Sequence, residues 1–130
     1  MLVIDASAAV RSAATLQGFA LLASFELFAP PLMWSESLSV LHETQWRGAS
    51  SPELAIRARE RLLAAPITRY LANDLYAEAW RVADLLGWAK VYDAEYVALA
   101  RLLGCRLLTV DERLRRGAAR LVDIVGPAEL

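Results

Sequence analysis

Two acidic residues stand directly after apolar runs that are typical of buried strands. Asp5 follows residues 2–4 (LVI), and Asp111 follows residues 107–110 (LLTV). Ligands of open parallel sheets bind beyond the carboxyl ends of the strands, so both acids are candidate site residues. On neighbouring strands about 4.8 Å apart, the two carboxylates would repel each other by about 4 kcal/mol at an effective dielectric constant of about 20. Such a pair requires a proton or a cation.

Each of these acids also has a purely structural interpretation. An Asp between a strand and a helix can act as an N-cap, because its side chain accepts hydrogen bonds from the first free N–H groups of the helix. Glu36 has apolar neighbours at i−4, i−3 and i+4 of a predicted helix, where burial would raise its pKa, unless its side chain reaches solvent at the apolar edge. Asp93 precedes apolar residues at i+3, i+4 and i+7, and it is either a site residue or the N-cap of a buried helix.

The elements that must position these acids alternate along the chain. Strands are predicted at residues 2–4, 25–29, 67–71, 106–110 and 120–125. Helices are predicted at residues 6–14, from the Pro30-Pro31 pair to Arg47, at residues 52–64, from an Asn73-Asp74 cap to Leu86, and at residues 93–103. This alternation predicts an α/β fold, with a mainly parallel five-stranded sheet flanked by helices and right-handed crossovers. The length of 130 residues predicts one domain, residues 1–130.

Composition excludes several classes of protein. Hydrophobic residues make up 57 % of the chain, which excludes intrinsic disorder and leaves an apolar excess that predicts an oligomer or a bound companion. The net charge of −1 excludes a molecule that binds nucleic acid through overall positive charge, so any such contact must be local. No apolar stretch approaches the length of about 20 residues that spans a membrane, so no membrane partner is expected. A single cysteine and the early Asp5 predict a cytoplasmic protein without a signal peptide.

Four segments of the chain together form a recognisable pattern. They are residues 2–7 (LVIDAS), 29–36 (APPLMWSE), 92–100 (YDAEYVALA) and 107–111 (LLTVD). In order and spacing they resemble the PIN domain family, and within it the VapC-type toxins, the ribonuclease halves of toxin–antitoxin pairs. The resemblance spans residues 2 to about 125. It implies a Mg²⁺- or Mn²⁺-dependent endoribonuclease on a PIN-like parallel sheet with helices on both faces.

The resemblance also implies which residues carry the activity. The family's catalytic and metal-binding acids correspond to Asp5, Glu36, Asp93 and Asp111, and its supporting hydroxyl residues correspond to Ser7 and Thr109. Mg²⁺ prefers oxygen ligands and needs only one or two direct carboxylates, so this set suits such an ion. Glu95 departs from the apolar residue expected at its position, and it is either an additional outer ligand or a partner contact. The family further implies a homodimer and a cognate antitoxin protein.

RNA must be held near an acidic pocket by local features. The candidates for backbone contacts are Arg11, Lys90, Arg113, Arg115 and Arg116, and the candidates for base stacking are Trp34, Trp88 and Tyr92. The alternative is that the charges form a solvated face and the aromatic residues belong to the core. His42 lies outside the four motifs and is predicted to be a surface or packing residue, and Cys105 is predicted to be a small apolar filler.

Two other functions compete with the nuclease. One is a non-catalytic PIN-like protein-interaction module, whose acids would serve as helix caps and partner ion pairs. The other is a phosphate-accepting receiver-like domain, which also places acids at strand ends. Such a domain has a lysine after its last strand, whereas the only lysine of this chain, Lys90, precedes Asp93.

Overall fold

The computed structural model describes residues 1–130. The strands are short: β1 (Leu2–Ile4), β2 (Leu27–Ala29), β3 (Ile67–Arg69), β4 (Arg106–Leu108) and β5 (Ile124–Val125). The helices are α1 (Ala6–Ala13), α2 (Leu32–Trp46), α3 (Pro52–Leu63), α4 (Leu75–Leu86), α5 (Tyr92–Leu103) and α6 (Glu112–Ala118). Two 3₁₀ turns, η1 (Ala20–Leu22) and η2 (Pro127–Glu129), complete the chain. No helix has the length and apolar character needed to cross a membrane.

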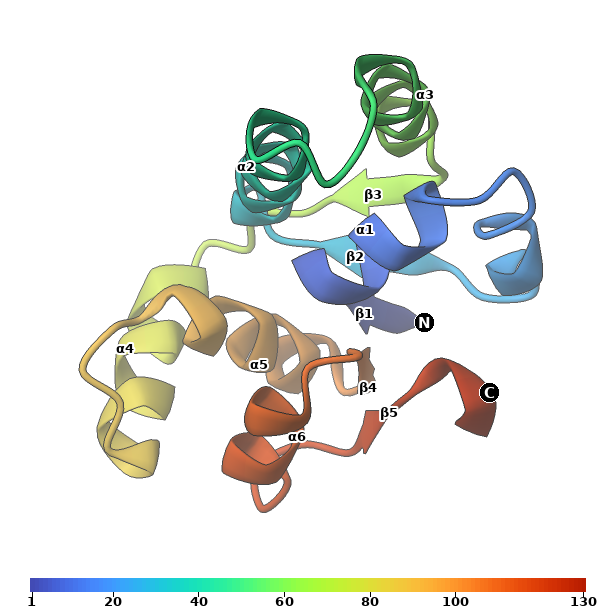
Figure 1. Cartoon of the computed structure of the whole chain (residues 1–130). Coiled ribbons are helices and arrows are strands. Elements are labelled where there is room, and N and C mark those ends of the chain that lie inside the picture. The colour runs from blue at the N-terminus through green and yellow to red at the C-terminus, as the bar shows by residue number, and fades with distance from the viewer.

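The five strands form one parallel sheet in the order β3-β2-β1-β4-β5 (Figure 1). The central strand β1 is completely buried, which explains why its sequence is a continuous apolar run. Ile4 of β1 lies opposite Leu108 of β4, so Asp5 and Thr109 leave the sheet side by side. This strand order differs from the 2-1-3-4-5 order of flavodoxin-like folds such as receiver domains. The topology therefore excludes the receiver-like alternative.

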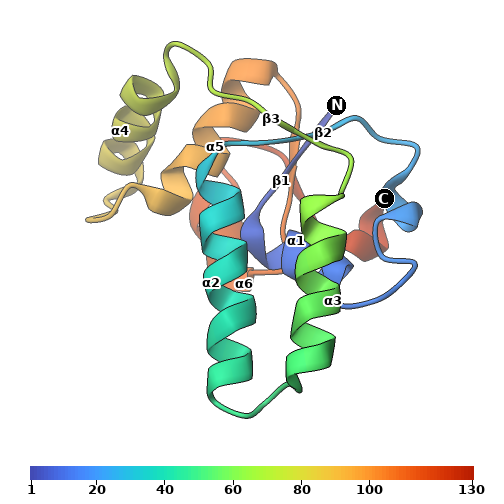
Figure 2. The same cartoon turned by 90° about the horizontal axis from the view of Figure 1, so that it is seen from above.

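Helices cover both faces of the sheet, as predicted. Helices α1, α2 and α3 pack on one another, whereas α5 packs on α4 and on the central strands β1 and β4. Successive strands are added toward one edge of the sheet from β1 to β3, and toward the opposite edge from β4 to β5. Because the crossovers are right-handed, this reversal of direction places the two groups of helices on opposite faces of the sheet. Figure 2 shows α2 and α3 as an antiparallel pair that extends away from the sheet.

Helix boundaries follow local sequence signals. The side chain of Ser51 caps α3 by accepting a hydrogen bond from the Leu54 N–H. Gly87 ends α4 and Gly104 ends α5, both in the left-handed conformation with φ of 71° and 63°. Because the strands are parallel, the helices α1, α2, α5 and α6 all begin at the carboxyl edge of the sheet, where the positive ends of their dipoles favour acidic residues.

Several predicted details are wrong. Strands β2, β3 and β4 are each two residues shorter than the predicted strands 25–29, 67–71 and 106–110. The fifth strand covers only Ile124–Val125 and not residues 120–125, because Leu121 and Val122 turn back to donate N–H hydrogen bonds to the Ala118 carbonyl. Helix α6 at residues 112–118 has no counterpart among the predicted helices, because its apolar stripe consists only of Leu114 and Ala118. Asp93 is not the N-cap of α5, because the helix begins at Tyr92 with Val91 as its cap.

Candidate active site

Asp5 is the most buried acid at the carboxyl edge of the sheet, with 3 % of its surface exposed. Its Oδ1 accepts hydrogen bonds from the Ser7 hydroxyl (2.7 Å) and the Ala8 N–H (2.9 Å), and its Oδ2 accepts one from the Thr109 hydroxyl. Burial raises the pKa of Asp5, the bonds from Thr109, Ala8 and Ser7 lower it, and the charge of Asp111 raises it. The bond from Ala8 shows that Asp5 also caps α1.

Ser7 and Thr109 connect Asp5 to the end of β4. Their hydroxyl oxygens lie 3.1 Å apart, and Thr109 Oγ1 also accepts a hydrogen bond from the Asp111 N–H (3.0 Å). Asp111 in turn caps α6, because its Oδ1 accepts bonds from the N–H groups of Arg113 (2.9 Å) and Leu114 (3.3 Å). Both of these bonds go to Oδ1, which leaves Oδ2 of Asp111 for another partner. The capping and site interpretations of Asp5 and Asp111 are therefore compatible.

Glu36 reaches the same edge from the second turn of α2. Its Oε1 accepts a hydrogen bond from the hydroxyl of Tyr96, so the half-buried side chain does not simply extend into solvent. Burial raises the pKa of Glu36, the Tyr96 bond lowers it, and the charges of Asp93 and Asp5 raise it. Sequence reasoning treated Tyr96 only as part of an apolar stripe. A fully buried Tyr whose hydroxyl needs a partner was the signal that could have revealed its role.

Asp93 lies in the first turn of α5 and is exposed. Partial desolvation raises the pKa of its carboxyl group, the charge of Asp111 raises it further, and Arg113 lowers it. Asp111 thus acts on both Asp5 and Asp93, and these two act on Glu36. The four predicted acids form one group of mutually repelling carboxylates.

Glu95 is a fifth acid beside this group. It is 8 % exposed, and burial followed by the charge of Glu36 raises its pKa. This burial and the interaction with Glu36 favour the interpretation of an outer member of the acidic group. An exposed contact with a protein partner is less consistent with this burial.

The acidic group suits a divalent cation in its chemistry. In the structure, no set of three or more Asp, Glu, His or Cys side chains is arranged so that it could hold a metal ion. Mg²⁺ nevertheless needs only one or two direct carboxylates and keeps several water ligands. The exposed Asp93 and the free Oδ2 of Asp111 are oxygen donors of this kind. Burial, followed by the charges of neighbouring carboxylates, raises the pKa values of Asp5, Glu36 and Asp93.

The predicted RNA-contact residues separate into two groups. Lys90 and Arg113 line a cavity of about 590 Å³ together with Glu36 and Asp93. The others lie elsewhere: Arg11 borders a different hollow on α1, Arg115 forms an ion pair with Glu129, and Arg116 is exposed on α6. Outside the acidic group, His42 is exposed on α2, and Cys105 packs against the core as a free thiol.

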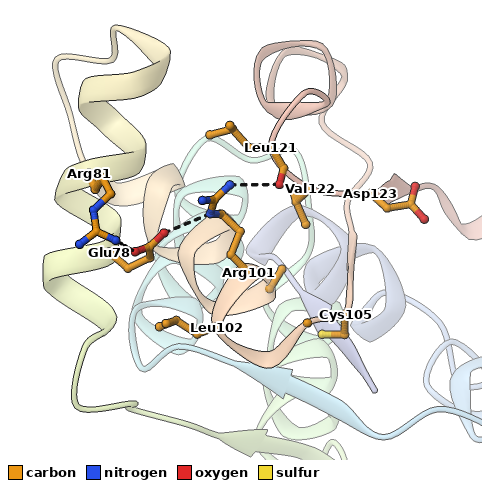
Figure 3. Close-up of a pocket in the computed structure, with 10 residues that line it drawn as sticks. Glu78, Arg81, Arg101, Leu102, Cys105, Leu121, Val122 and Asp123 are labelled. Carbon is orange, nitrogen blue, oxygen red and sulfur yellow. Dashed lines mark hydrogen bonds and ion pairs between the residues drawn. The ribbon is translucent and has the colours of Figure 1, made fainter.

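A second cavity, of about 530 Å³, lies near the start of β4 and is drawn in Figure 3. Three of its charged side chains, those of Glu78, Arg81 and Arg101, already form ion pairs. Glu78 of α4 accepts hydrogen bonds from Arg81 and, at 3.1 Å, from Arg101 of α5, and Arg101 also donates to the Leu121 carbonyl at 3.3 Å (Figure 3). These contacts fasten α4 to α5 and to the segment before β5, which is a structural role.

The fold and the acidic group together define a class of protein: an open parallel α/β domain with carboxylates beyond strands β1 and β4, where the connections leave the sheet in opposite directions. The sequence model of the PIN domain matches residues 2–120. The chain belongs to the PIN domain family.

Individual relatives agree with this assignment. The VapC ribonuclease Mb0985 of Mycobacterium bovis is 39 % identical over 120 residues, which cover 88 % of each chain. Ribonuclease VapC3 of Mycobacterium tuberculosis is 40 % identical over 95 residues, covering 73 % of this chain and 67 % of that protein.

Solved structures share the fold. The crystal structure of PAE2754 from Pyrobaculum aerophilum has a TM-score of 0.77 at 23 % identity and covers 98 % of this chain and 91 % of its own. A toxin–antitoxin complex from Klebsiella pneumoniae contains a chain with a TM-score of 0.65 at 16 % identity, with 98 % of both chains covered. At these identities the likeness concerns the fold.

Proposed function

We propose that this protein is a metal-dependent endoribonuclease and the toxin component of a toxin–antitoxin pair. The observation that carries the proposal is that Asp111 raises the pKa values of Asp5 and Asp93, and that these two raise the pKa of Glu36, which supports one group of acids at the carboxyl edge of the sheet. Support for RNA as the substrate comes from two relatives named as VapC ribonucleases, at 39 % and 40 % identity.

The residues of this site take different parts in the proposed reaction. Asp93 and Asp111 would bind Mg²⁺ or Mn²⁺ directly, because their oxygens are accessible. When bound, such an ion lowers the pKa of a water molecule and offsets negative charge on the phosphate. Ser7 and Thr109 hold Asp5 in one orientation, so that its carboxylate is fixed relative to the ion.

Glu36 has a position suited to proton transfer. Its raised pKa makes it a better base than an ordinary carboxylate, and the Tyr96 hydroxyl fixes one of its oxygens. The other oxygen remains free to orient the attacking water and to accept its proton. This arrangement needs no His, Cys or Lys nucleophile.

Substitution of single acids tests this proposal. The Asp93→Asn and Asp5→Asn variants should fold and lose at least 100-fold in the rate of RNA cleavage with Mg²⁺, because removing a positioned charged group typically costs that much or more. Glu43→Gln, an exposed acid on α2, is the control and should cleave normally. Cleavage that survives both Asp substitutions would refute the site.

Binding of the ion is measured separately by calorimetric titration with Mn²⁺. The wild-type protein should take up Mn²⁺ and the Asp93→Asn variant should bind it at least 10-fold more weakly. A non-catalytic interaction module, whose acids serve only as caps, would take up no Mn²⁺ at this edge, and that result would favour the alternative.

The proposed partners follow from the toxin assignment. A cognate antitoxin protein would cover apolar surface and place a cation among the acids, and a second copy of this chain would form a homodimer. Large apolar side chains outside the core support such partners, including Trp46 and Trp80, which are 83 % and 68 % exposed. Coexpression with the antitoxin should abolish cleavage, and cleavage that persists in the purified complex would contradict this role.

A further inference from the structure

The cavity beside Glu36 and Asp93 contains features that the proposed hydrolysis does not use. Trp88 and Tyr92 contribute aromatic side chains to its lining, and Lys90 and Arg113 contribute positive charges. Its volume of about 590 Å³ exceeds that of one nucleotide, and it is open to the acidic group on one side. An aromatic surface together with cations, next to a phosphate-cleaving centre, is the combination that binds single-stranded nucleic acid.

The indole of Trp88 is held firmly against α6. A Cβ atom added to Gly117, inside this helix, would lie only 3.0 Å from Cζ2 of Trp88 and 3.7 Å from its Cε2 and Nε1 atoms. Glycine inside a helix costs about 1 kcal/mol relative to alanine, and here it allows the ring to pack directly on the backbone. Trp88 is partly buried and partly exposed in the cavity, so it offers an aromatic surface that is already in place before a ligand binds.

The two cations of the cavity are available for a ligand. Lys90 and Arg113 are exposed, and the ion pairs of the structure involve other arginines. Arg115, in contrast, is paired with Glu129 through both guanidinium nitrogens of its fork. Among the predicted RNA contacts, the structure therefore favours Lys90 and Arg113.

The second tryptophan among the candidates for stacking, Trp34, is occupied by the protein itself. The guanidinium of Arg69 lies over its ring, 4.6 Å from the ring centre. Trp34 also does not line the cavity with Glu36 and Asp93. Of the two tryptophans, Trp88 is therefore the one whose setting fits a ligand.

We propose that this cavity is a subsite for one nucleobase of single-stranded RNA, adjacent to the phosphodiester that is cleaved. The base stacks on the indole of Trp88, and Lys90 and Arg113 contact the phosphates that flank this nucleotide. The inference rests on the proposed ribonuclease function for its substrate, and it adds that the enzyme grips the base beside the cleaved bond. Because every base has an aromatic face, this subsite contributes affinity with little sequence preference.

The test measures RNA binding without cleavage. A fluorescein-labelled oligouridylate of eight nucleotides is titrated with protein in EDTA, and the fluorescence anisotropy is recorded. Trp88→Leu, which keeps apolar contact with Gly117 but removes the aromatic face, should weaken binding about 5- to 150-fold, the usual effect of losing one base stack. Trp88→Phe should retain most of the affinity. The matched control is Trp46→Leu at the far end of α2, whose side chain is 83 % exposed and outside the cavity.

Two further measurements separate stacking from charge. On an oligonucleotide of the same length that lacks all bases, Trp88→Leu and wild type should bind equally. Lys90→Gln and Arg113→Gln should each reduce the slope of log affinity against log salt by about 0.7, as expected for the loss of one phosphate contact on a single strand. Arg59→Gln, an exposed residue of α3, is the charge control and should leave the slope unchanged.

The outcomes distinguish the subsite from the nuclease. Wild-type cleavage together with undiminished binding by a folded Trp88→Leu protein would overturn the subsite and leave the ribonuclease intact. A Trp88-dependent loss of binding in a protein that cleaves no RNA with Mg²⁺ would support the subsite and overturn the ribonuclease. If Trp88→Leu weakens binding to the base-free oligonucleotide as much as binding to RNA, the proposed subsite is also wrong. The weakening would then come from folding or charge and not from the loss of base stacking. Circular dichroism melting of each variant identifies any that is unfolded. Trp88→Met, which also removes the aromatic face but keeps a long apolar side chain, then takes the place of Trp88→Leu with the same expected loss of binding.

Discussion

Asp5 and Asp111 show that one carboxylate can serve both the fold and the chemistry. Each caps the helix that follows its strand, and each belongs to the acidic group at the carboxyl edge. The capping bonds use Oδ1 in both residues, whereas Oδ2 of Asp5 accepts from Thr109. An Asp→Asn substitution keeps an oxygen for the cap, so it separates a loss of charge from a loss of structure.

The titration of Glu36 gives a prediction about stability. Because burial raises the pKa of Glu36 in the folded protein above its ordinary value of 4.5, ionisation is harder in the folded state than in the unfolded one. This penalty is absent below about pH 4.5 and grows as the pH rises through the raised pKa. In EDTA, Glu36→Gln should therefore melt at a higher temperature than wild type at pH 7.5, by about 4 °C for each kcal/mol gained, and the two should converge at pH 4.5.

Thermal melts by circular dichroism at both pH values check this prediction. Glu43→Gln, on the exposed side of α2, is the control and should match wild type throughout. An equal or lower melting temperature for Glu36→Gln at pH 7.5 would mean that the ionised carboxylate is not destabilising. With Mn²⁺ present, the melting temperature of Glu36→Gln should no longer exceed that of wild type, because the ion offsets the repulsion of Glu36 by Asp93 and Asp5.

At the scale of elements, Glu78 determines how α4 is attached. Its side chain is 9 % exposed and joins Arg81 of the same helix to Arg101 of α5. Arg101 lies in the last turn of α5, at the opposite end of the helix from Asp93, and it extends the connection to the Leu121 carbonyl. This pairing explains why a charged residue tolerates a buried position on α4.

Replacement of Glu78 should destabilise the fold without affecting the chemistry. Glu78→Ala leaves Arg101 with one partner fewer, and we expect the free energy of unfolding to fall by about 1–3 kcal/mol in urea titrations. Asp84→Ala, an exposed acid on the same helix, should change it by less than about 0.5 kcal/mol. Cleavage per folded molecule should be equal in both variants. A loss of cleavage in the folded Glu78→Ala protein would show that this network also supports the site.

At the scale of the molecule, the balance of surface and core points to self-association. The core contains 29 buried hydrophobic residues, yet large apolar side chains such as Leu16 and Leu21 remain about 80 % exposed. Light scattering of the purified protein at micromolar concentration should therefore give twice the mass of 14.3 kDa. A stable monomer would contradict the proposed homodimer, while the cleavage experiments would remain valid.

The sequence by itself determined the alternation of strands and helices, and it predicted the four acids as site residues. Its signals are local: a continuous apolar run ends at Asp5, prolines precede α2, and Gly87 and Gly104 end their helices. Such signals depend on the chain's own geometry, so they can be read without knowledge of the fold. They were weakest at α6 and β5, where few apolar residues are present and tertiary contacts decide the boundaries.

The tertiary structure decided which residues meet. Only the pairing of β1 with β4 brings Thr109 to Asp5, across 104 positions of sequence. Only the approach of the N-terminal halves of α2 and α5 brings the Tyr96 hydroxyl to Glu36. Tertiary structure likewise brings Trp88 against Gly117 of α6, which lies 29 positions later in the sequence, and the proposed role of Trp88 depends on this contact. These contacts depend on strand order and helix packing, which arise from burial of the whole apolar surface and are not encoded in any single segment.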